Sequence, residues 1–361
     1  IMIIFAAMIH VNLDRGQIST AFVRLGEIIE AFLENNLDMN APSSLILERA
    51  VNNAKASNGW FTYDSIRQAL RGIVYMVRDE AMRSWLSRYD QFSMIRSLRV
   101  GVVSAGNIPA VGFHDFLCVL VSGNSYIGKL SRDDQYLIPA MAEILISLEP
   151  KLDGLIQFTD DRLTGFDAVI ATGSGNTARY FEYYFEKYPN IIRRNRNSVI
   201  VLTGSEDRAD FEAISHDIFD YYGLGCRNAS MVLYPDGYEM TNFFDVLAER
   251  QEMMEMVKYA NNVEYRRAIM LIGQEVFFDT GNLLLKRSES LASPVGVVHL
   301  KSYINDQEIK SWLVDHKEEI QCVIGLQEED GFVRPGRGQY PELWDYADGV
   351  DVMEFLFSVK K

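Results

Sequence analysis

Cysteine is scarce in this sequence of 361 residues, which contains only Cys118, Cys226 and Cys322. An odd number of cysteines without a CxxC pair excludes a disulfide framework and a zinc knuckle. The five histidines show neither HExxH nor facial-triad spacing, so we expect no metal site. This cysteine content is typical of a reducing compartment, and we predict a cytoplasmic location.

Basic residues and long apolar runs are also in short supply. The chain carries 35 Lys and Arg against 50 Asp and Glu, a formal charge of −15, and its pI is near 4.9. Such a surface repels phosphate backbones, which argues against nucleic-acid binding and leaves only a local basic pocket for an anionic cofactor. The apolar run 1–9 is too short to span a bilayer and lacks a basic flank. We interpret it as a buried strand or as residues added to the natural chain.

The remaining composition, 48% hydrophobic and 24% charged residues, is that of an ordinary globular protein, and the length suggests two domains. Apolar residues recur at helical spacing from residue 18 to about 89, which predicts an all-helical preface. From about residue 99, short β-branched runs alternate with helical segments, which is typical of a parallel, doubly wound α/β sheet. The predicted strands are 99–104, 125–130, 154–158, 166–172 and 198–203, and the predicted helices are 112–121, 134–148, 176–187 and 207–222.

A second α/β set follows, with strands predicted at 229–234, 295–300 and 320–325 and helices near 242–259 and 306–316. The polar segment 193–197 predicts a domain boundary. We therefore expect residues 1–197 to form the helical preface and a nucleotide-binding α/β domain, and residues 198–335 to form a second α/β domain that carries Cys226. Residues 336–361 are expected to close a sheet or form an oligomer interface, with a strand at 352–359.

A glycine turn follows the strand predicted at 166–172. It reads Gly173-Ser174-Gly175-Asn176-Thr177-Ala178, which fits the G-x-G-x-x-A pattern. At a helix N-terminus such a turn lets backbone N–H groups approach a pyrophosphate. The acidic residue expected about 20 positions later is missing, because that region reads Arg193-Arg194-Asn195-Arg196. A glycine-rich turn that binds nothing is the alternative interpretation.

Lys129 ends the strand predicted at 125–130 and is followed by Ser131 and Arg132. These residues would lie at the carboxyl edge of a sheet, where α/β proteins bind ligands. If a nucleotide binds there, Lys129 can donate to a ribose hydroxyl and Arg132 can meet a 2′-phosphate, which favours NADP. The alternative is a solvated lysine.

Cys226 is the candidate nucleophile, because Gly223 and Gly225 expose the backbone around it and Arg227 favours the reactive thiolate. Cys118 and Cys322 lie in apolar segments and are expected to be core residues. Asn107 follows the strand predicted at 99–104. Its amide is a neutral donor of the kind that holds an oxyanion, although asparagine is also a common turn residue.

Taken together, these segments resemble the aldehyde dehydrogenase superfamily, and most closely its LuxC-type acyl-CoA reductase branch, from about residue 99 to the end of the chain. The motifs that carry the resemblance are Val102-Val103-Ser104-Ala105-Gly106-Asn107-Ile108-Pro109, Val121-Ser122-Gly123-Asn124-Ser125-Tyr126-Ile127-Gly128-Lys129, Ala171-Thr172-Gly173-Ser174, Gly223-Leu224-Gly225-Cys226 and Trp344-Asp345-Tyr346-Ala347-Asp348-Gly349. The resemblance implies an aldehyde dehydrogenase-like α/β fold with Cys226 as nucleophile and Asn107 as oxyanion donor. It further implies that Lys129 contacts the nucleotide ribose and that Gly173 and Ser174 form the pyrophosphate turn.

The chain departs from that family in two places. Where oxidising members carry Glu-Leu-Gly-Gly, with a base for deacylation, it has Arg194-Asn195-Arg196-Asn197 and no carboxylate. Near the usual Glu-x-Phe-Gly-Pro segment it has Glu289-Ser290-Leu291-Ala292-Ser293-Pro294, which leaves the nicotinamide-ribose contact open. An acyl group on Cys226 can leave with water, which needs a base, or with hydride, which does not. The missing carboxylate therefore favours reduction.

We accordingly predict an NADPH-dependent reductase, with NADH as the alternative cofactor, that converts a fatty acyl thioester such as acyl-CoA to the aldehyde through an acyl-cysteine. Two alternatives are an aldehyde dehydrogenase that uses another base to form the acid, and a catalytically silent scaffold that docks an acyl-transfer partner. The resemblance also implies a homodimer or tetramer. An acyl carrier protein could replace CoA as the acyl donor, and we expect neither a nucleic-acid partner nor a membrane span.

Overall fold

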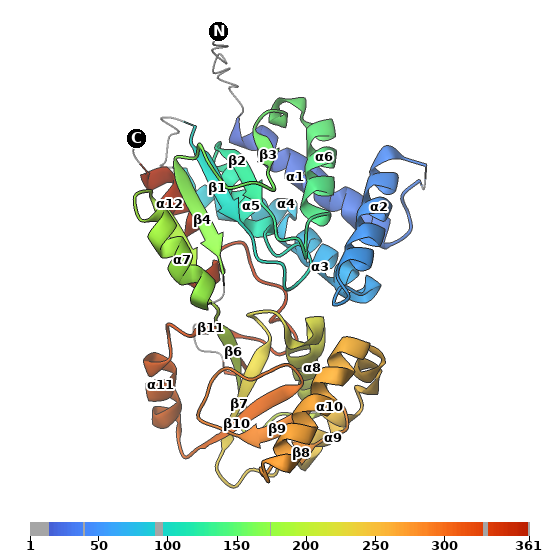
Figure 1. Cartoon of the computed structure of the whole chain (residues 1–361), viewed down its shortest axis with the longest axis vertical. Helices are drawn as coiled ribbons and strands as arrows, with labels where there is room; N and C mark the ends of the chain where they lie inside the picture. The colour runs from blue at the N-terminus through green and yellow to red at the C-terminus, as the bar shows by residue number, and fades with distance from the viewer. Residues whose placement is uncertain (1–13, 39, 91–96, 174, 328–330, 360–361) are drawn as a thin grey trace.

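The computed structural model describes residues 14–38, 40–90, 97–173, 175–327 and 331–359. These residues form two α/β lobes, drawn one above the other in Figure 1. One lobe contains a five-stranded parallel sheet in the order β3-β2-β1-β4-β5. The other contains a seven-stranded sheet in the order β12-β11-β6-β7-β10-β9-β8, parallel except where β8 pairs with β9. The predicted pair of α/β units with a helical preface is confirmed. The apolar run 1–9 lies outside the described residues.

The helical preface packs on the first sheet's side of the molecule. Its helices are α1 (Arg15–Leu33), α2 (Pro42–Ser57), α3 (Tyr63–Met76) and α4 (Asp79–Leu86), followed by the turn η1 (Ser87–Tyr89). Helix α1 buries Phe22, which meets Phe113 and Phe116 edge-on with ring centroids about 6 Å apart (6.0 and 5.9 Å). The spacing of apolar residues by three and four therefore marks the face that joins the preface to the α/β core.

The first sheet has β1 at its centre. Its strands are β1 (Arg99–Val103), β2 (Ser125–Lys129), β3 (Ile156–Phe158), β4 (Ala168–Thr172) and β5 (Asn190–Arg193), connected through α5 (Phe113–Val121), α6 (Leu137–Leu148), η2 (Pro150–Leu152) and α7 (Gly175–Phe185). The chain winds from β1 outward to β3 and then returns to β4 on the other side of β1. Such a reversal leaves a crevice between the carboxyl ends of β1 and β4. Strand β5 is missing from our prediction, because it contains only two apolar residues and ends at Arg193, where the predicted boundary segment begins.

The second sheet is assembled from β6 (Asn197–Val201), β7 (Ala229–Pro235), β8 (Phe278–Asp279), β9 (Leu284–Arg287), β10 (Val297–Tyr303), β11 (Ile320–Gly325) and β12 (Phe332–Val333). Its helical elements are α8 (Arg208–Phe219), η3 (Asp220–Gly223), α9 (Thr241–Ala248), η4 (Gln251–Glu255), α10 (Val257–Ile272) and α11 (Asp306–Asp315). The single helix predicted at 242–259 is wrong: the polar run 249–252 separates α9 from α10, with η4 between them.

The strand predicted at 352–359 is also wrong. These residues form the helix α12 (Val352–Ser358), which begins at the side chain of Asp351, an acceptor for the backbone N–H of Glu354. Apolar residues at helical spacing, Val352, Met353 and Leu356, join the core of the first lobe, so α12 lies on the same lobe as α1 (Figure 1). The chain passes from one sheet to the other between β5 and β6, and the domain limits at residues 197 and 335 stay predictions.

Candidate active site

A cavity of about 500 Å³ lies between the two lobes. The first lobe supplies the loops that follow β1 and β4, at the carboxyl edge of its sheet. The second lobe supplies residues that precede or begin β6, β7 and β11, at the amino edge of its sheet. The lining residues that the argument uses are Asn107, Gly173, Arg193, Arg196, Cys226 and Asp348.

Asn107 and Cys226 come from different lobes and line this one cavity. The side-chain amide of Asn107 donates a hydrogen bond of 2.7 Å to the carbonyl oxygen of Leu224, two residues before the thiol. An amide nitrogen carries two hydrogens, so this contact leaves one donor for a ligand in the cavity. The structure thus brings together the predicted nucleophile and the loop that carries the predicted oxyanion donor.

The loop before Cys226 has an unusual backbone. Tyr221, Tyr222 and Gly223 follow one another with φ of 51°, 59° and 73°, in the left-handed region that only glycine adopts without strain. Asn228 holds the next turn, because its Oδ1 accepts from the backbone N–H of Gly225 at 2.9 Å. A Cβ on Gly225 would lie 2.9 Å from that same oxygen, so the close approach requires glycine. Because of this backbone, α8 ends at Phe219 and does not reach residue 222, where the predicted helix ends.

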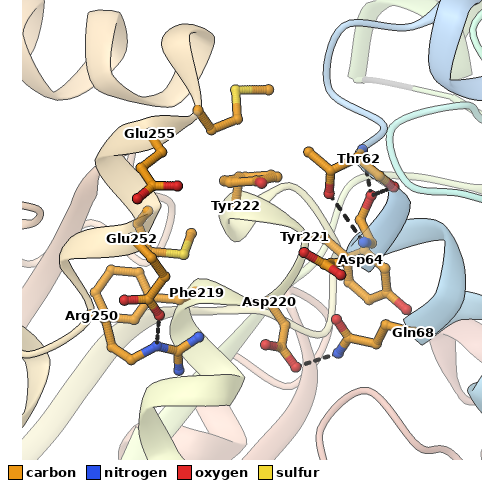
Figure 2. A pocket seen from close by; sticks show the side chains of 13 residues that line it. Thr62, Asp64, Gln68, Phe219, Asp220, Tyr221, Tyr222, Arg250, Glu252 and Glu255 are labelled. Atoms are coloured by element: carbon orange, nitrogen blue, oxygen red, sulfur yellow. Dashed lines mark hydrogen bonds and ion pairs between the residues drawn. The ribbon is translucent and has the colours of Figure 1, made fainter.

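The helical preface also supports this loop. Gln68 of α3 donates to the carboxylate of Asp220, as Figure 2 shows, and His216 contacts the other oxygen of that carboxylate at 3.1 Å. Gln68 and Asp220 line a separate hollow of about 350 Å³ between α3 and the segments 219–222 and 250–256. We did not anticipate this link from the sequence, because the preface and the nucleophile loop are about 150 residues apart.

The setting of the Cys226 thiol differs from our prediction. The residue is exposed at the cavity. Many protein atoms nevertheless surround the thiol, and the desolvation they cause is the largest influence on its pKa, which it raises. Arg227 lowers the pKa, as predicted, without reversing the effect of desolvation. Reaction at neutral pH therefore requires a partner that takes up the thiol proton or favours the thiolate. Cys118 and Cys322 are buried, as predicted.

Gly173 lies at the crevice between β1 and β4 and lines the cavity. An added Cβ there would come within 3.0 Å of Thr177 and Phe181 on α7, so the turn is tight against the helix start. A glycine at the end of a strand beside a helix N-terminus lets a pyrophosphate approach the backbone, so Gly173 and the start of α7 fit a dinucleotide. Ser174 lies outside the described residues.

Lys129, Ser131 and Arg132 lie one strand further from the crevice, at and after the end of β2. The Lys129 ammonium donates to the carbonyl oxygens of Asp160 and Asp161, each at 2.8 Å. A third donor remains for a ribose hydroxyl. Ser131 packs against Gly106 of the loop after β1, where a Cβ would lie 2.5 Å from the serine Oγ, and Arg132 is exposed. None of the three lines the Cys226 cavity.

Sequence reasoning missed two charged groups in the cavity. Arg193 forms a buried bidentate pair with Asp115 of α5, at 2.6 and 2.8 Å. Asp348, from the turn η5 (Ala347–Gly349), reaches the segment 194–197, where its Oδ1 lies 3.2 Å from Nε of Arg196. A carboxylate is therefore present beside the segment that lacks one in the sequence. Asp348 belongs to the ending 344–349 that carries part of the family resemblance, but sequence alone does not place that ending in the cavity.

Glu289 does not line this cavity. Its carboxylate pairs with Lys301 at 2.6 Å, and 83% of its side chain is exposed. Glu289 thus gives no sign of the nicotinamide-ribose contact that the resemblance implies for this segment.

The described residues offer neither a cluster of metal-ligating side chains nor a helix that could span a membrane. They contain no group of three or more His, Cys, Asp or Glu side chains arranged to hold a metal ion. No helix among them has the length and apolar character to cross a bilayer.

Comparison with known proteins gives a family and a fold. The family model for acyl-CoA reductase (LuxC) matches residues 34–261, well over half of the chain. A search of curated proteins gives no match. Among solved structures, the aldehyde dehydrogenase KauB from Pseudomonas aeruginosa superposes with a TM-score of 0.60 at 12% identity, covering 88% of this chain and 73% of that one.

Two further solved structures agree. The NAD+ complex of an aldehyde dehydrogenase from Bacillus cereus gives a TM-score of 0.59 at 13% identity over 88% of this chain and 73% of that one. Aldehyde dehydrogenase 21 from Physcomitrella patens, in complex with succinate, gives 0.58 at 11% identity over 86% and 74%. At these identities the likeness establishes an aldehyde dehydrogenase-like fold.

Proposed function

Because the chain belongs to the LuxC acyl-CoA reductase family, we propose that it reduces a fatty acyl thioester, acyl-CoA, to the aldehyde with NADPH as reductant. The family and the fold together indicate an oxidoreductase that acts on acyl or aldehyde groups and uses a nicotinamide cofactor. The observation that carries the finer proposal is the shared cavity of Cys226 and Asn107, bounded by Gly173.

The first half-reaction transfers the acyl group to the enzyme. The Cys226 thiolate attacks the thioester carbonyl, the carbon–sulfur bond to CoA breaks, and CoA leaves and takes up a proton. The Asn107 amide offers its second N–H, and Cys226 its backbone N–H, to the oxygen that becomes negative in the tetrahedral intermediate. Asn107 is already placed by its bond to Leu224, so little reorganisation is needed when the charge develops.

The second half-reaction releases the aldehyde. A bound nicotinamide supplies the hydride that reduces the acyl carbon. Gly173 and the start of α7 receive the pyrophosphate in this proposal, and Lys129 and Arg132 receive the ribose and its 2′-phosphate, with Ser131 beside them. Asn107 again holds the oxyanion until the carbon–sulfur bond breaks and Cys226 is regenerated as the thiolate.

Mass spectrometry of the intact protein after incubation with acyl-CoAs of graded length tests this proposal. We expect one acyl adduct on the wild-type chain and on the Cys322→Ala control, and none on Cys226→Ala. NADPH should still bind to Cys226→Ala, because that residue receives only the acyl group. Undiminished aldehyde formation by Cys226→Ala would refute the assignment of the nucleophile.

A further inference from the structure

We propose that the same cavity has a second activity, hydrolysis of the acyl-enzyme to the carboxylic acid, in which Asp348 is the base that activates water. This inference rests on the proposed acyl-Cys226 intermediate. It differs from that proposal in the fate of the acyl group, which here leaves with water and not with hydride.

Asp348 is positioned from three sides. Its carboxylate meets Arg196 at 3.2 Å, and only 13% and 14% of the two side chains are exposed. Its backbone N–H donates to Gln321 at the start of β11, at 3.3 Å, and the backbone of Arg194 donates to its carboxylate. With φ at 60° the residue adopts a left-handed conformation that is strained for a side chain, a feature that collects at functional sites.

These contacts place a carboxylate against the 194–197 segment, where the sequence of this chain has none. Asp348 arrives from a turn about 150 residues later in the chain and lines the cavity together with Cys226 and Asn107. The absence of a base in the local sequence therefore does not mean the absence of a base in the folded site.

The charges around Asp348 suit a base. Desolvation raises the pKa of its carboxyl, and Glu318 acts in the same direction, while Arg196 and Arg193 oppose them. A carboxylate with a raised pKa accepts a proton from water more readily than an ordinary one. Desolvation is the main cause that raises the pKa of Cys226, and the negative charge of Asp348, which lines the same cavity, adds to it.

The hydrolytic step balances without an oxidant or a reductant. Asp348 takes a proton from a water molecule while the oxygen of that water attacks the acyl carbon. Asn107 holds the resulting oxyanion. The carbon–sulfur bond then breaks, and the Cys226 thiolate takes the proton back from Asp348. One water and one acyl-enzyme thus give one carboxylic acid and the free thiol.

The experiment follows the lifetime of the acyl-enzyme in the absence of nicotinamide nucleotide. The protein is acylated with an acyl-CoA, excess reagent is removed, and the adduct is followed by intact mass while the released acid is measured. We expect the adduct on Asp348→Asn to persist at least ~10-fold longer than on the wild type, since a positioned base contributes about 10²–10⁴-fold. Asp348→Ser should behave in the same way.

Glu318→Gln is the matched control, because Glu318 approaches the same Arg196 at 3.5 Å but is 87% exposed and does not line the cavity. Its adduct should decay far more like the wild type than like Asp348→Asn, because Glu318 has only a small influence on the Asp348 carboxyl, behind desolvation and the two arginines. Iodoacetamide labelling of Cys226 checks that the site is intact: Asp348→Asn should react at least as fast as wild type, because the charge that raises the thiol pKa is gone.

The pH dependence of the wild-type chain provides evidence that needs no variant. Its deacylation rate should rise as the Asp348 carboxyl loses its proton and then level off. A rate that only follows hydroxide, or an adduct on Asp348→Asn and Asp348→Ser that decays as fast as on wild type, would overturn the hydrolytic role. Failure of the wild type to form any adduct would instead overturn the proposed function.

Discussion

The side-chain amide of Asn107 lies 2.7 Å from the carbonyl oxygen of Leu224 and joins the loop after β1 to the loop that carries Cys226. The two residues belong to different lobes, so this bond helps to hold the predicted oxyanion donor beside the loop of the predicted nucleophile. A relative movement of the lobes would break it and separate the two groups. The cavity is thus competent only when the lobes are together.

Replacement of Asn107 by alanine should therefore slow acyl transfer without preventing NADPH binding. Loss of one oxyanion donor reduces kcat by about 10²–10³-fold in other acyl-transfer enzymes. Stopped-flow measurement of CoA release would give the rate. Labelling of Cys226 with iodoacetamide should remain close to wild type. Acyl transfer at the wild-type rate would remove Asn107 from the mechanism.

Arg132→Ala distinguishes the two nicotinamide cofactors. Because NADPH differs from NADH only by its 2′-phosphate, loss of the guanidinium should weaken NADPH binding by about 1 kcal/mol or more and leave NADH binding nearly unchanged. Titration of both nucleotides by fluorescence gives the two dissociation constants. An equal effect on both would contradict a 2′-phosphate contact at Arg132.

The buried pair of Asp115 and Arg193 connects α5 with the end of β5. Removal of one partner leaves an unpaired charge in the core, which costs about 3–5 kcal/mol. We therefore expect Arg193→Met to lower the free energy of unfolding in urea by that amount. Glu249→Gln is the control, since its pair with Arg208 is exposed to solvent and is expected to contribute little to stability. Similar losses of unfolding free energy in both variants would mean that the buried pair stabilises the fold no more than the exposed pair does.

Asp134 gives a prediction about pH. This buried residue accepts hydrogen bonds from the backbone of Ala110 and Val111, and desolvation raises its pKa from 3.8 to about 7. Because the folded-state pKa lies above the unfolded value, the neutral Asp134 carboxyl stabilises the fold fully below about pH 4, and this contribution is lost as the pH rises through 7. The loss is on the order of 4 kcal/mol.

Asp134→Asn should remove that part of the pH dependence, because an amide does not ionise. Between pH 4 and pH 8 the wild type should lose unfolding free energy that the variant keeps, so the variant should become the more stable of the two relative to their difference at pH 4. Denaturant titrations across this range measure it. A constant difference would mean that Asp134 has an ordinary pKa.

The sequence predicted the elements with strong apolar patterns and missed those without them. Strands β1 and β11 match their predicted ranges to within one residue, because β-branched runs bounded by turn residues are a local signal. β5 has only Ile191 and Ile192 to mark it, and the apolar residues of α12 fit a strand or a helix equally well over so short a segment.

The candidate site was predictable only where it is local. Short motifs pointed to Cys226, Asn107 and Gly173, which the fold places around one cavity. Asp348 reaches that cavity through tertiary contacts that no motif encodes, and the pKa of Cys226 depends on the atoms packed around it. NADPH as cofactor, a dimeric or tetrameric state, an acyl-transfer partner and a cytoplasmic location stay predictions.

Residues 336–346 contact both the helical preface and the second lobe. Trp85 and Tyr89 of the preface bond to the hydroxyl of Tyr346, and Asp217 of the second lobe accepts from the backbone of Gly336 and Gly338. During synthesis on the ribosome, part of the apolar core of the first lobe stays uncovered until residues 343–356 have been made. A protein cut short near residue 335 would keep Asn107 and Cys226, would lose Asp348, and would expose apolar surface to chaperones and proteases.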